Sequence, residues 1–289
     1  MSNKKNFDRG NTLKVSIMDK KKAEERAEAK ALEVELAHPR WTDIWATEFP
    51  PRFDKQTVCP ALQYLIDKGH ILKGRALVPG CGRGYDVTAL ANDDRYVVGV
   101  DISEDAIFSA NERLHQILTL CEKCVIPHDP PISSLEFKCM SFFDLETDVP
   151  EKLFDFVYDY TFLCALDPRI HKKWKEKMTQ LVKEGGELLC IVYPIMEKTG
   201  GPPFQMSLEY VENLCAPEFR PFNGFAYEGP FHSLPWSNAP NAIEMLPPEL
   251  CHPGRDGQGG NSNSAASGII RFKRINLSES DDDLSDYED

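Results

Sequence analysis

The stretch RALVPGCGRGYDVTALA, residues 75–91, runs from an apolar strand-like segment through three close glycines into a helical pattern. Gly80, Gly82 and Gly84 give a GxGxG spacing, and Tyr85 stands where the dinucleotide-binding fingerprint GxGxxG has its third glycine. A tyrosine there hinders the close helix–strand approach that a pyrophosphate site uses. The loop can still bring backbone N–H groups up to a smaller anion, such as a carboxylate. A tight turn that binds no ligand would have the same glycine pattern.

Strand-like and helical segments alternate after this loop. The apolar runs are nearly continuous, as is typical of parallel strands that are covered on both faces. Short links between them favour a doubly wound, mostly parallel α/β sheet. His171 is expected on the polar side of a helix that Asp167-Pro168 opens and Gly185-Gly186 closes. The expected strands are 75–79, 96–101, 135–142, 154–160 and 187–194, with a last strand within 268–277.

Composition divides the chain into four parts. A lead of strong helix formers has almost no apolar face, an insertion is rich in Gly, Pro, Ser and Asn, and the last residues are acidic. In the acidic end Ser280 and Ser285 each precede acids, the pattern of an acid-directed kinase site, although a solubilising tail has the same composition. The predicted parts are a polar helical or disordered lead at 1–38, one domain at 39–228 plus 268–277, the insertion at 229–267 and the disordered tail at 278–289.

Charge and cysteine usage narrow the class of protein. A formal net charge of −13 argues against a nucleic-acid partner, which needs a concentrated basic face. The first residues lack the apolar core of a signal peptide, and we expect a cytoplasmic protein, monomeric and without a membrane segment. Cys121, Cys124 and His128 resemble half of a zinc site, but no second ligand pair stands at a suitable spacing. We therefore expect no metal.

Two features around the glycine loop point to a binding site. Asp101 ends the second expected strand, about twenty residues after the glycines, where a carboxylate can accept both hydroxyls of a ribose. The alternative is an acid at the start of the helix that follows. Trp41 and Trp45 are four residues apart, so one helical turn presents both rings. They suit a cation such as a sulfonium, or they are ordinary core aromatics. A carboxylate, a ribose and a sulfonium together describe S-adenosylmethionine.

The chain resembles the thiopurine/thiol S-methyltransferase family, and within it the plant and microbial thiol or halide methyltransferases. The resemblance rests on RWTDIW, RALVPGCGRGYDVTALA, YVVGVDIS, FDFVYDYTFLCALDP and the segment that begins GGELLCIVYP and contains GGPPF. It implies a Rossmann-like class I methyltransferase fold with a seven-stranded sheet. It also implies cofactor contacts at Trp41, Trp45, Phe53, Gly80, Gly82, Asp101, Ser141, Phe142 and Tyr160.

The implied reaction moves a methyl group from S-adenosylmethionine to a small soft nucleophile: a thiol or sulfide, or a halide or thiocyanate. Thiolates are strong nucleophiles, so positioning and desolvation suffice and no obligatory base is expected. Tyr160 and Tyr193 are the candidates for bordering the substrate. Two alternatives stay open. One is a catalytically silent interaction protein that retains the fold, and the other is a nicotinamide-dependent oxidoreductase, which would need the GxGxxG spacing.

Overall fold

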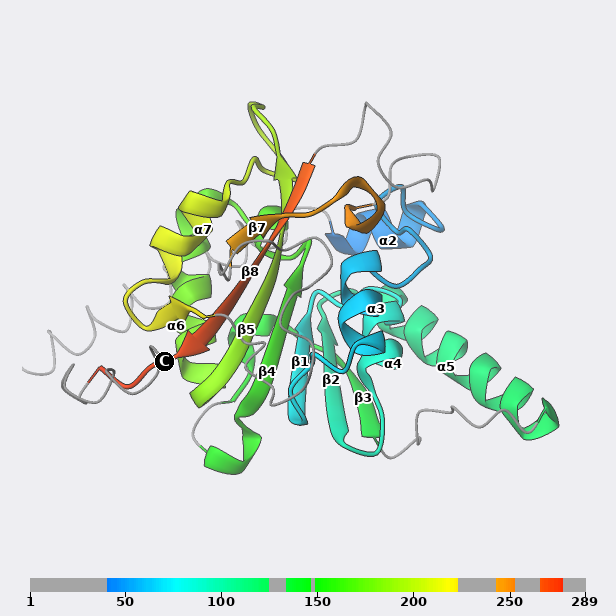
Figure 1. The fold of residues 1–289 in the computed structure, drawn as a ribbon. Coiled ribbons are helices and arrows are strands. Elements are labelled where there is room, and N and C mark those ends of the chain that lie inside the picture. Colours follow the sequence, from blue (N-terminus) through cyan, green and yellow to red (C-terminus); the bar gives the residue numbers. More distant parts are fainter. Residues whose placement is uncertain (1–40, 125–133, 147–148, 223–242, 253–265, 278–289) are drawn as a thin grey trace, which may run out of the picture.

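The computed structural model describes residues 41–124, 134–146, 149–222, 243–252 and 266–277. Among these residues one sheet of eight strands forms the centre, in the order β3-β2-β1-β4-β5-β8-β6, with β7 paired to β8 (Figure 1). The strands are β1 (Gly74–Pro79), β2 (Arg95–Asp101), β3 (Leu135–Cys139), β4 (Phe154–Tyr160), β5 (Val182–Ile195), β6 (Phe219–Pro221), β7 (Ile243–Met245) and β8 (Ala266–Arg274). The α-helices are α2 (Trp41–Thr47), α3 (Pro60–Asp67), α4 (Tyr85–Leu90), α5 (Glu104–Cys124), α6 (His171–Leu181) and α7 (Leu208–Cys215).

The predicted doubly wound, mostly parallel sheet is confirmed. Strands β1 to β5 pair in parallel, and β8 runs antiparallel to β5. The outer edge of β8 carries two short strands end to end, because β6 pairs with Phe272–Arg274 and β7 with Gly268–Ile270. The sheet is therefore seven strands wide, as expected, but contains eight strands, because β6 and β7 share one edge. Strand β7 comes from the segment predicted as an insertion, of which 243–252 are described.

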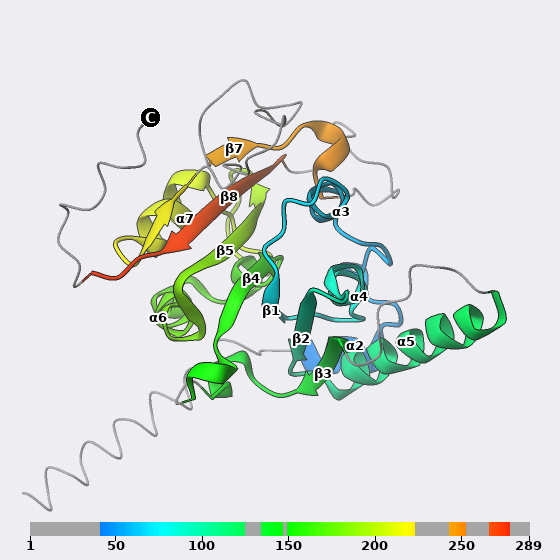
Figure 2. The same ribbon diagram turned by 60° about the horizontal axis from the view of Figure 1, so that its bottom comes forward.

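Successive side chains of β1 point to opposite faces of the sheet and are buried in two separate hydrophobic cores. Leu77 is buried with Trp174 of α6 and Val211 of α7 on one face of the sheet. Ala76 and Val78 are buried on the other face with residues of α3 and α4. Figures 1 and 2 show these two helix pairs on opposite sides of the sheet. This double burial explains the continuous apolar runs in the strand sequences.

Several expected boundaries and one orientation are corrected. The third strand ends at Cys139 rather than at 142, because Ser141 caps the 3-10 helix η2 (Phe142–Asp144). Helix α6 ends at Leu181, and Gly185-Gly186 lie within β5 instead of closing the helix. His171 does not face solvent. It is buried between the Tyr210 hydroxyl, 2.8 Å from Nδ1, and the Leu166 carbonyl, 3.0 Å from Nε2, and burial lowers its pKa.

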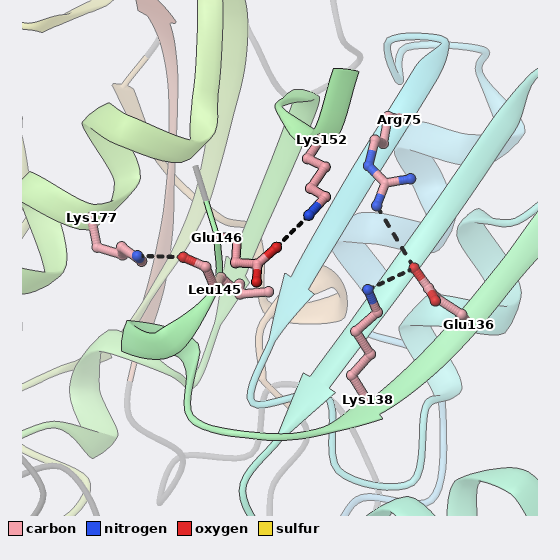
Figure 3. A network of polar contacts seen from close by, with 7 residues as sticks. All are labelled: Arg75, Glu136, Lys138, Leu145, Glu146, Lys152 and Lys177. Carbon is pink, nitrogen blue, oxygen red and sulfur yellow. Dashed lines mark hydrogen bonds and ion pairs between the residues drawn. The ribbon is translucent and has the colours of Figure 1, made fainter. Parts of the chain in front are cut away.

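Charged side chains connect the early part of β1 to β3 (Figure 3). Glu136 lies 3.1 Å from the Lys138 ammonium and 3.7 Å from the Arg75 guanidinium. Near them Lys152 pairs with Glu146, and Lys177 donates to the Leu145 carbonyl at 2.6 Å. These side chains are partly exposed, so each pair contributes little to stability.

A buried carboxyl connects α3 to α4. Asp86, in the first turn of α4, accepts a hydrogen bond from the Cys59 N–H at 2.9 Å, just before α3 begins. Burial raises the pKa of Asp86 to about 7, against the opposing effects of the Cys59 amide and the Arg113 charge. The neutral acid is therefore the favoured form in the folded state below about pH 7.

No helix among the described residues has both the length and the apolar character needed to cross a membrane. The lead at 1–38 and the tail at 278–289, including Ser280 and Ser285, lie outside the described residues. So does His128, whereas Cys121 and Cys124 fall in the last turn of α5.

Replacement of Asp86 by asparagine is expected to change how stability depends on pH. Because the folded pKa of about 7 lies above the unfolded value, the Asp86 contribution is complete below about pH 4 and is lost as the pH rises through 7. Asparagine does not ionise, so Asp86→Asn removes this loss of stability at higher pH. Relative to wild type, the variant should gain roughly 1–4 kcal/mol in free energy of unfolding between pH 4 and pH 8. Urea titrations at several pH values measure the gain.

The exposed Asp93 provides the matched control, since Asp93→Asn makes the same chemical change at the surface. Parallel curves for wild type and Asp86→Asn across this range would show that Asp86 is ionised in the folded protein.

Candidate active site

The glycine loop between β1 and α4 is held in a conformation that suits glycine. Gly80, Gly82 and Gly84 have φ angles of 60°, 51° and 70°, in the left-handed region. A Cβ atom on Gly80 would lie 2.6 Å from the Phe162 ring, and one on Gly82 would lie 3.2 Å from the Trp45 ring. The loop backbone therefore runs in direct contact with two aromatic side chains.

Gly84 provides the close helix–strand contact that Tyr85 was expected to hinder. A Cβ atom at Gly84 would lie 2.4 Å from the Phe137 ring of β3. Tyr85 turns away, and its ring faces the Arg113 guanidinium at 4.0 Å. The expected hindrance is wrong, because the close contact occurs one residue earlier than in the GxGxxG spacing.

Asp101 joins this loop to the helix that follows β2. Its Oδ2 atom accepts from the Gly82 N–H at 2.9 Å, and its Oδ1 atom accepts from the Ser103 N–H at 3.0 Å. The side chain is buried, and desolvation raises its pKa while the amide donors oppose that rise. Each carboxylate oxygen has a second lone pair. The contact with the start of α5 is thus present, and the Ile102 amide also stabilises the charged carboxylate.

The backbone N–H groups of the loop are largely bonded within the protein. Cys81 N–H donates to the Val100 carbonyl at 3.0 Å, and Gly84 N–H donates to the Cys81 carbonyl at 2.9 Å. With Gly82 N–H bonded to the Asp101 carboxylate, these three amides have partners within the protein, because the loop folds back onto the end of β2. Whether the loop binds the carboxylate of a ligand, as expected from its sequence, stays a prediction.

Three aromatic rings lie together beside the loop. Trp41 and Trp45 share one helix, α2, as their spacing predicts. Phe53 meets both edge-on, with ring centroids 5.4 Å from Trp41 and 5.6 Å from Trp45. Trp45 is buried against Gly82, whereas Phe53 is 41% exposed. The cluster thus combines one ring fixed in the core with one ring open to solvent.

A second aromatic group meets the loop at Gly80. Ser141 accepts a hydrogen bond from the Phe143 N–H at 3.3 Å, which fixes the turn after β3. Phe142 is buried, with its ring centroid 5.1 Å from that of Phe162. Phe162 in turn contacts Gly80. The residues expected at the adenine thus connect through packed rings to the glycine loop.

Tyr160 and Tyr193 end the neighbouring strands β4 and β5 and are bridged by a histidine that the sequence did not single out. His252 Nδ1 is hydrogen-bonded to the Tyr160 hydroxyl, and the His252 ring stacks on Tyr193 with centroids 4.0 Å apart. Burial raises the pKa of Tyr160 well above its ordinary value. Burial and the charge of Lys55 lower the pKa of His252 to about 3. Both groups are therefore neutral near pH 7.

His252 was missed because it follows the short η6 helix (Pro248–Leu250) inside the segment predicted as an insertion. The sequence offers one local signal: the apolar residues Leu246 and Cys251 interrupt this otherwise polar segment, and both are buried in the structure. The backbone N–H of His252 donates to the Ser267 hydroxyl at 3.1 Å, which ties the segment to β8.

These residues fit a nucleoside that carries a cationic chain and no phosphate. Asp101 keeps a lone pair beyond its amide bonds, the partly exposed rings of Trp41 and Phe53 offer faces for a cation, and Trp45 is buried in contact with Phe53. Within the described ranges no group of three or more His, Cys, Asp or Glu side chains is arranged to hold a metal ion.

Residues 36–226 match the family model described as thiopurine S-methyltransferase. The chain belongs to the thiopurine S-methyltransferase family. The match covers the glycine loop, Asp101, the aromatic cluster and both strand-end tyrosines, whereas His252 lies beyond it.

Curated relatives in this family carry related activities. The chain is 36% identical over 177 residues to the probable thiol methyltransferase 2 of Arabidopsis thaliana, covering 61% of this chain and 71% of the relative. It is 37% identical over 179 residues to thiocyanate methyltransferase 1 of the same plant, with the same coverage of each chain. A thiopurine S-methyltransferase of Legionella pneumophila (strain Corby) is 29% identical over 174 residues, 59% of this chain and 77% of the relative.

Solved structures agree on the fold. The N-methyltransferase NodS of Bradyrhizobium japonicum WM9, in complex with S-adenosyl-L-homocysteine, matches with a TM-score of 0.53 at 13% identity, covering 83% of this chain and all of that one. The [4+2]-cyclase SpnF matches with a TM-score of 0.51 at 15% identity, covering 75% and 80%. At these identities the likeness establishes a Rossmann-like α/β fold of the methyltransferase type and nothing more specific.

The loop packing predicts a large cost for adding one methyl group at Gly84. The new Cβ would strain a left-handed backbone and overlap the Phe137 ring, so Gly84→Ala should lower the free energy of unfolding by roughly 2–4 kcal/mol. Gly69 has the same φ of 70° with no atom within 4 Å of an added Cβ, so Gly69→Ala should cost only about 1 kcal/mol. Denaturant unfolding of both variants tests this, and equal losses would contradict the packing role of Gly84.

Proposed function

We propose that the protein is an S-adenosylmethionine-dependent methyltransferase that methylates a small soft nucleophile, a thiol or sulfide above all, with halide and thiocyanate as further acceptors. Membership of the thiopurine S-methyltransferase family and the named activities of the plant relatives support this. The single observation that carries the proposal is the buried Asp101 carboxylate, bonded to the glycine loop beside three aromatic rings at the ends of parallel strands.

The residues that would hold the cofactor come from the ends of four strands and from α2 with the segment that follows it. Asp101 accepts the ribose hydroxyls, and Ser141 and Phe142 flank the adenine. Gly80 and Gly82 let the cofactor approach the backbone, since neither carries a side chain. Trp41, Trp45, Phe53 and Tyr160 surround the sulfonium, whose charge is attracted by the ring faces. When bound, S-adenosylmethionine supplies an electrophilic methyl group on a good leaving group.

The chain then has to position and desolvate the acceptor. Tyr160 and Tyr193 border the acceptor, and neither hydroxyl ionises near pH 7, since burial raises the pKa of each. A protein base is not required, because thiols supply a fraction of thiolate at neutral pH and the thiolate is the nucleophile. Alignment of the acceptor and exclusion of water therefore provide most of the rate enhancement.

The two alternatives make different demands on the same residues. A nicotinamide-dependent oxidoreductase needs loop amides for a pyrophosphate, and three of the loop amides are bonded internally. A catalytically silent interaction protein would keep the fold and even the cofactor without turnover. A cytoplasmic location and a monomeric state stay predictions from composition.

The test is formation of S-adenosylhomocysteine by the full-length protein with a panel of a small thiol, hydrogen sulfide, iodide and thiocyanate. We expect acceptor-dependent turnover, fastest with the sulfur acceptors. Trp45→Leu keeps apolar bulk and removes the aromatic face, so it should raise the cofactor KM at least tenfold, whereas Trp45→Phe should stay within about threefold of wild type.

Absence of turnover with every acceptor, while S-adenosylmethionine still binds, would favour the silent interaction protein. Binding of NADH without binding of S-adenosylmethionine would favour the oxidoreductase. A Trp45→Leu variant that melts earlier but keeps its cofactor KM would place Trp45 in the core alone.

A further inference from the structure

The segment that carries His252 is fixed at the edge of the sheet where β4 and β5 end. Strand β7 pairs with β8, and the Leu246 N–H that follows it donates to the Ser267 carbonyl at 2.9 Å. The His252 N–H donates to the Ser267 hydroxyl at 3.1 Å. Leu246 and Cys251 are buried in the same core as residues of α3, and Figure 1 shows the segment in orange beside that helix. The position of the His252 ring is therefore set by β8 and by this core.

The His252 imidazole fills the space between two tyrosine rings. It stacks on Tyr193 with ring centroids 4.0 Å apart and an interplanar angle of 29°. Its centroid lies 5.5 Å from that of Tyr160, and its Nδ1 atom is hydrogen-bonded to the Tyr160 hydroxyl. His252 is 7% exposed, whereas both tyrosines are partly exposed. A planar ring of the protein therefore occupies a position at which a planar ligand would stack on Tyr193.

The space that Tyr193 also borders toward Met206 is small. Thr161, Cys164, Tyr193 and Met206 are among the residues that line a cavity of about 10 Å³ there. Such a cavity holds about one water-sized group. A sulfur atom or the end of a slim chain matches this size, whereas a ring does not.

We propose that His252 is a specificity-determining residue that excludes planar aromatic thiols, because its imidazole fills the slot in which their ring would stack. The acceptors are then hydrogen sulfide, small aliphatic thiols and small anions. The inference rests on the proposed function, because it takes Tyr160 and Tyr193 as borders of the acceptor. The exclusion depends on the shape of the acceptor, so it applies equally to a thiol and to the thiolate that reacts.

Two observations support this role for His252. Aromatic rings attract one another when they stack, so a Tyr193 ring with a free face would favour an aromatic acceptor. His252 also lies beyond the residues 36–226 that match the family model. The exclusion is therefore attributed to a segment of this chain outside the matched region.

Acceptor selectivity tests the proposal in the full-length protein with S-adenosylmethionine. The ratio of kcat/KM for 6-mercaptopurine to that for 2-mercaptoethanol should be low in wild type. His252→Ala opens the slot, so the ratio should rise at least tenfold, chiefly through a lower KM for the purine. His252→Phe keeps a ring in the slot and should stay within about threefold of wild type. All variants are measured at one pH, so the different thiolate fractions of the two acceptors cancel in the comparison.

His171 provides the matched control. It is also a buried histidine bonded to a tyrosine hydroxyl, that of Tyr210, but it lies on α6. His171→Ala should leave the acceptor ratio unchanged. An equal rise in His171→Ala and His252→Ala would attribute the effect to general loosening and overturn the proposal. An unchanged ratio in a His252→Ala variant that still methylates 2-mercaptoethanol would also overturn it.

A binding measurement tests the slot without turnover. The compound 4-methylimidazole has the shape of the side chain that His252→Ala removes. At tenfold above its Kd it should raise the melting temperature of His252→Ala by roughly 3 °C, and it should not stabilise wild type or His252→Phe. Absence of this stabilisation in His252→Ala would show that the slot closes without the imidazole and would overturn the proposal.

Wild type alone decides the question if His252→Ala does not fold. A wild-type protein that methylates 6-mercaptopurine as efficiently as 2-mercaptoethanol would refute the exclusion, and a preference of at least tenfold for 2-mercaptoethanol would support it. Failure of the proposed function gives a different result. In that case wild type turns over no acceptor at all, while 4-methylimidazole still stabilises His252→Ala.

Discussion

The hydrogen bonds of the Asp101 carboxylate connect the parts of the sheet edge on which the candidate site is built. One oxygen holds Gly82 in the loop after β1, and the other holds Ser103 at the start of α5. A buried carboxylate is stable only when donors surround it, so the loop has to stay close to the end of β2. The left-handed glycines, the contact of Gly84 with Phe137 and the stacking of Trp45 on Gly82 all depend on that position.

This constraint also decides which molecules the site suits. The loop gives three of its amides to the protein, so it has little left for a pyrophosphate. What remains is the Asp101 carboxylate, aromatic rings against Gly80 and Gly82, and the hydroxyls of Tyr160 at the end of β4 and of Tyr193 near the end of β5. Such a set matches a nucleoside with a cationic chain, which is what a methyltransferase of this family requires. At the same edge of the sheet, His252 is in contact with both Tyr160 and Tyr193.

Much of this could be predicted from the sequence, because local rules and family patterns agree. Strand β4 was placed at its observed bounds, and Trp41 and Trp45 share a helix as their spacing requires. The errors arose where tertiary contacts override local pattern. Tyr85 turns toward Arg113, so it does not obstruct the loop, and His171 is buried by contacts from Tyr210 and Leu166. His252 was not predicted, because only the apolar residues Leu246 and Cys251 in this Gly- and Pro-rich segment indicate that it returns to the sheet edge.

The most direct measurement is calorimetric binding of S-adenosylhomocysteine and of its 2′,3′-dideoxyribose analogue to wild type, Asp101→Asn and the control Asp105→Asn, which changes an acid in the first turn of α5. If Asp101 holds the ribose, wild type and Asp105→Asn should prefer the complete cofactor product at least tenfold, and Asp101→Asn should lose most of that preference. A preference that survives in Asp101→Asn would place the ribose elsewhere and contradict the account.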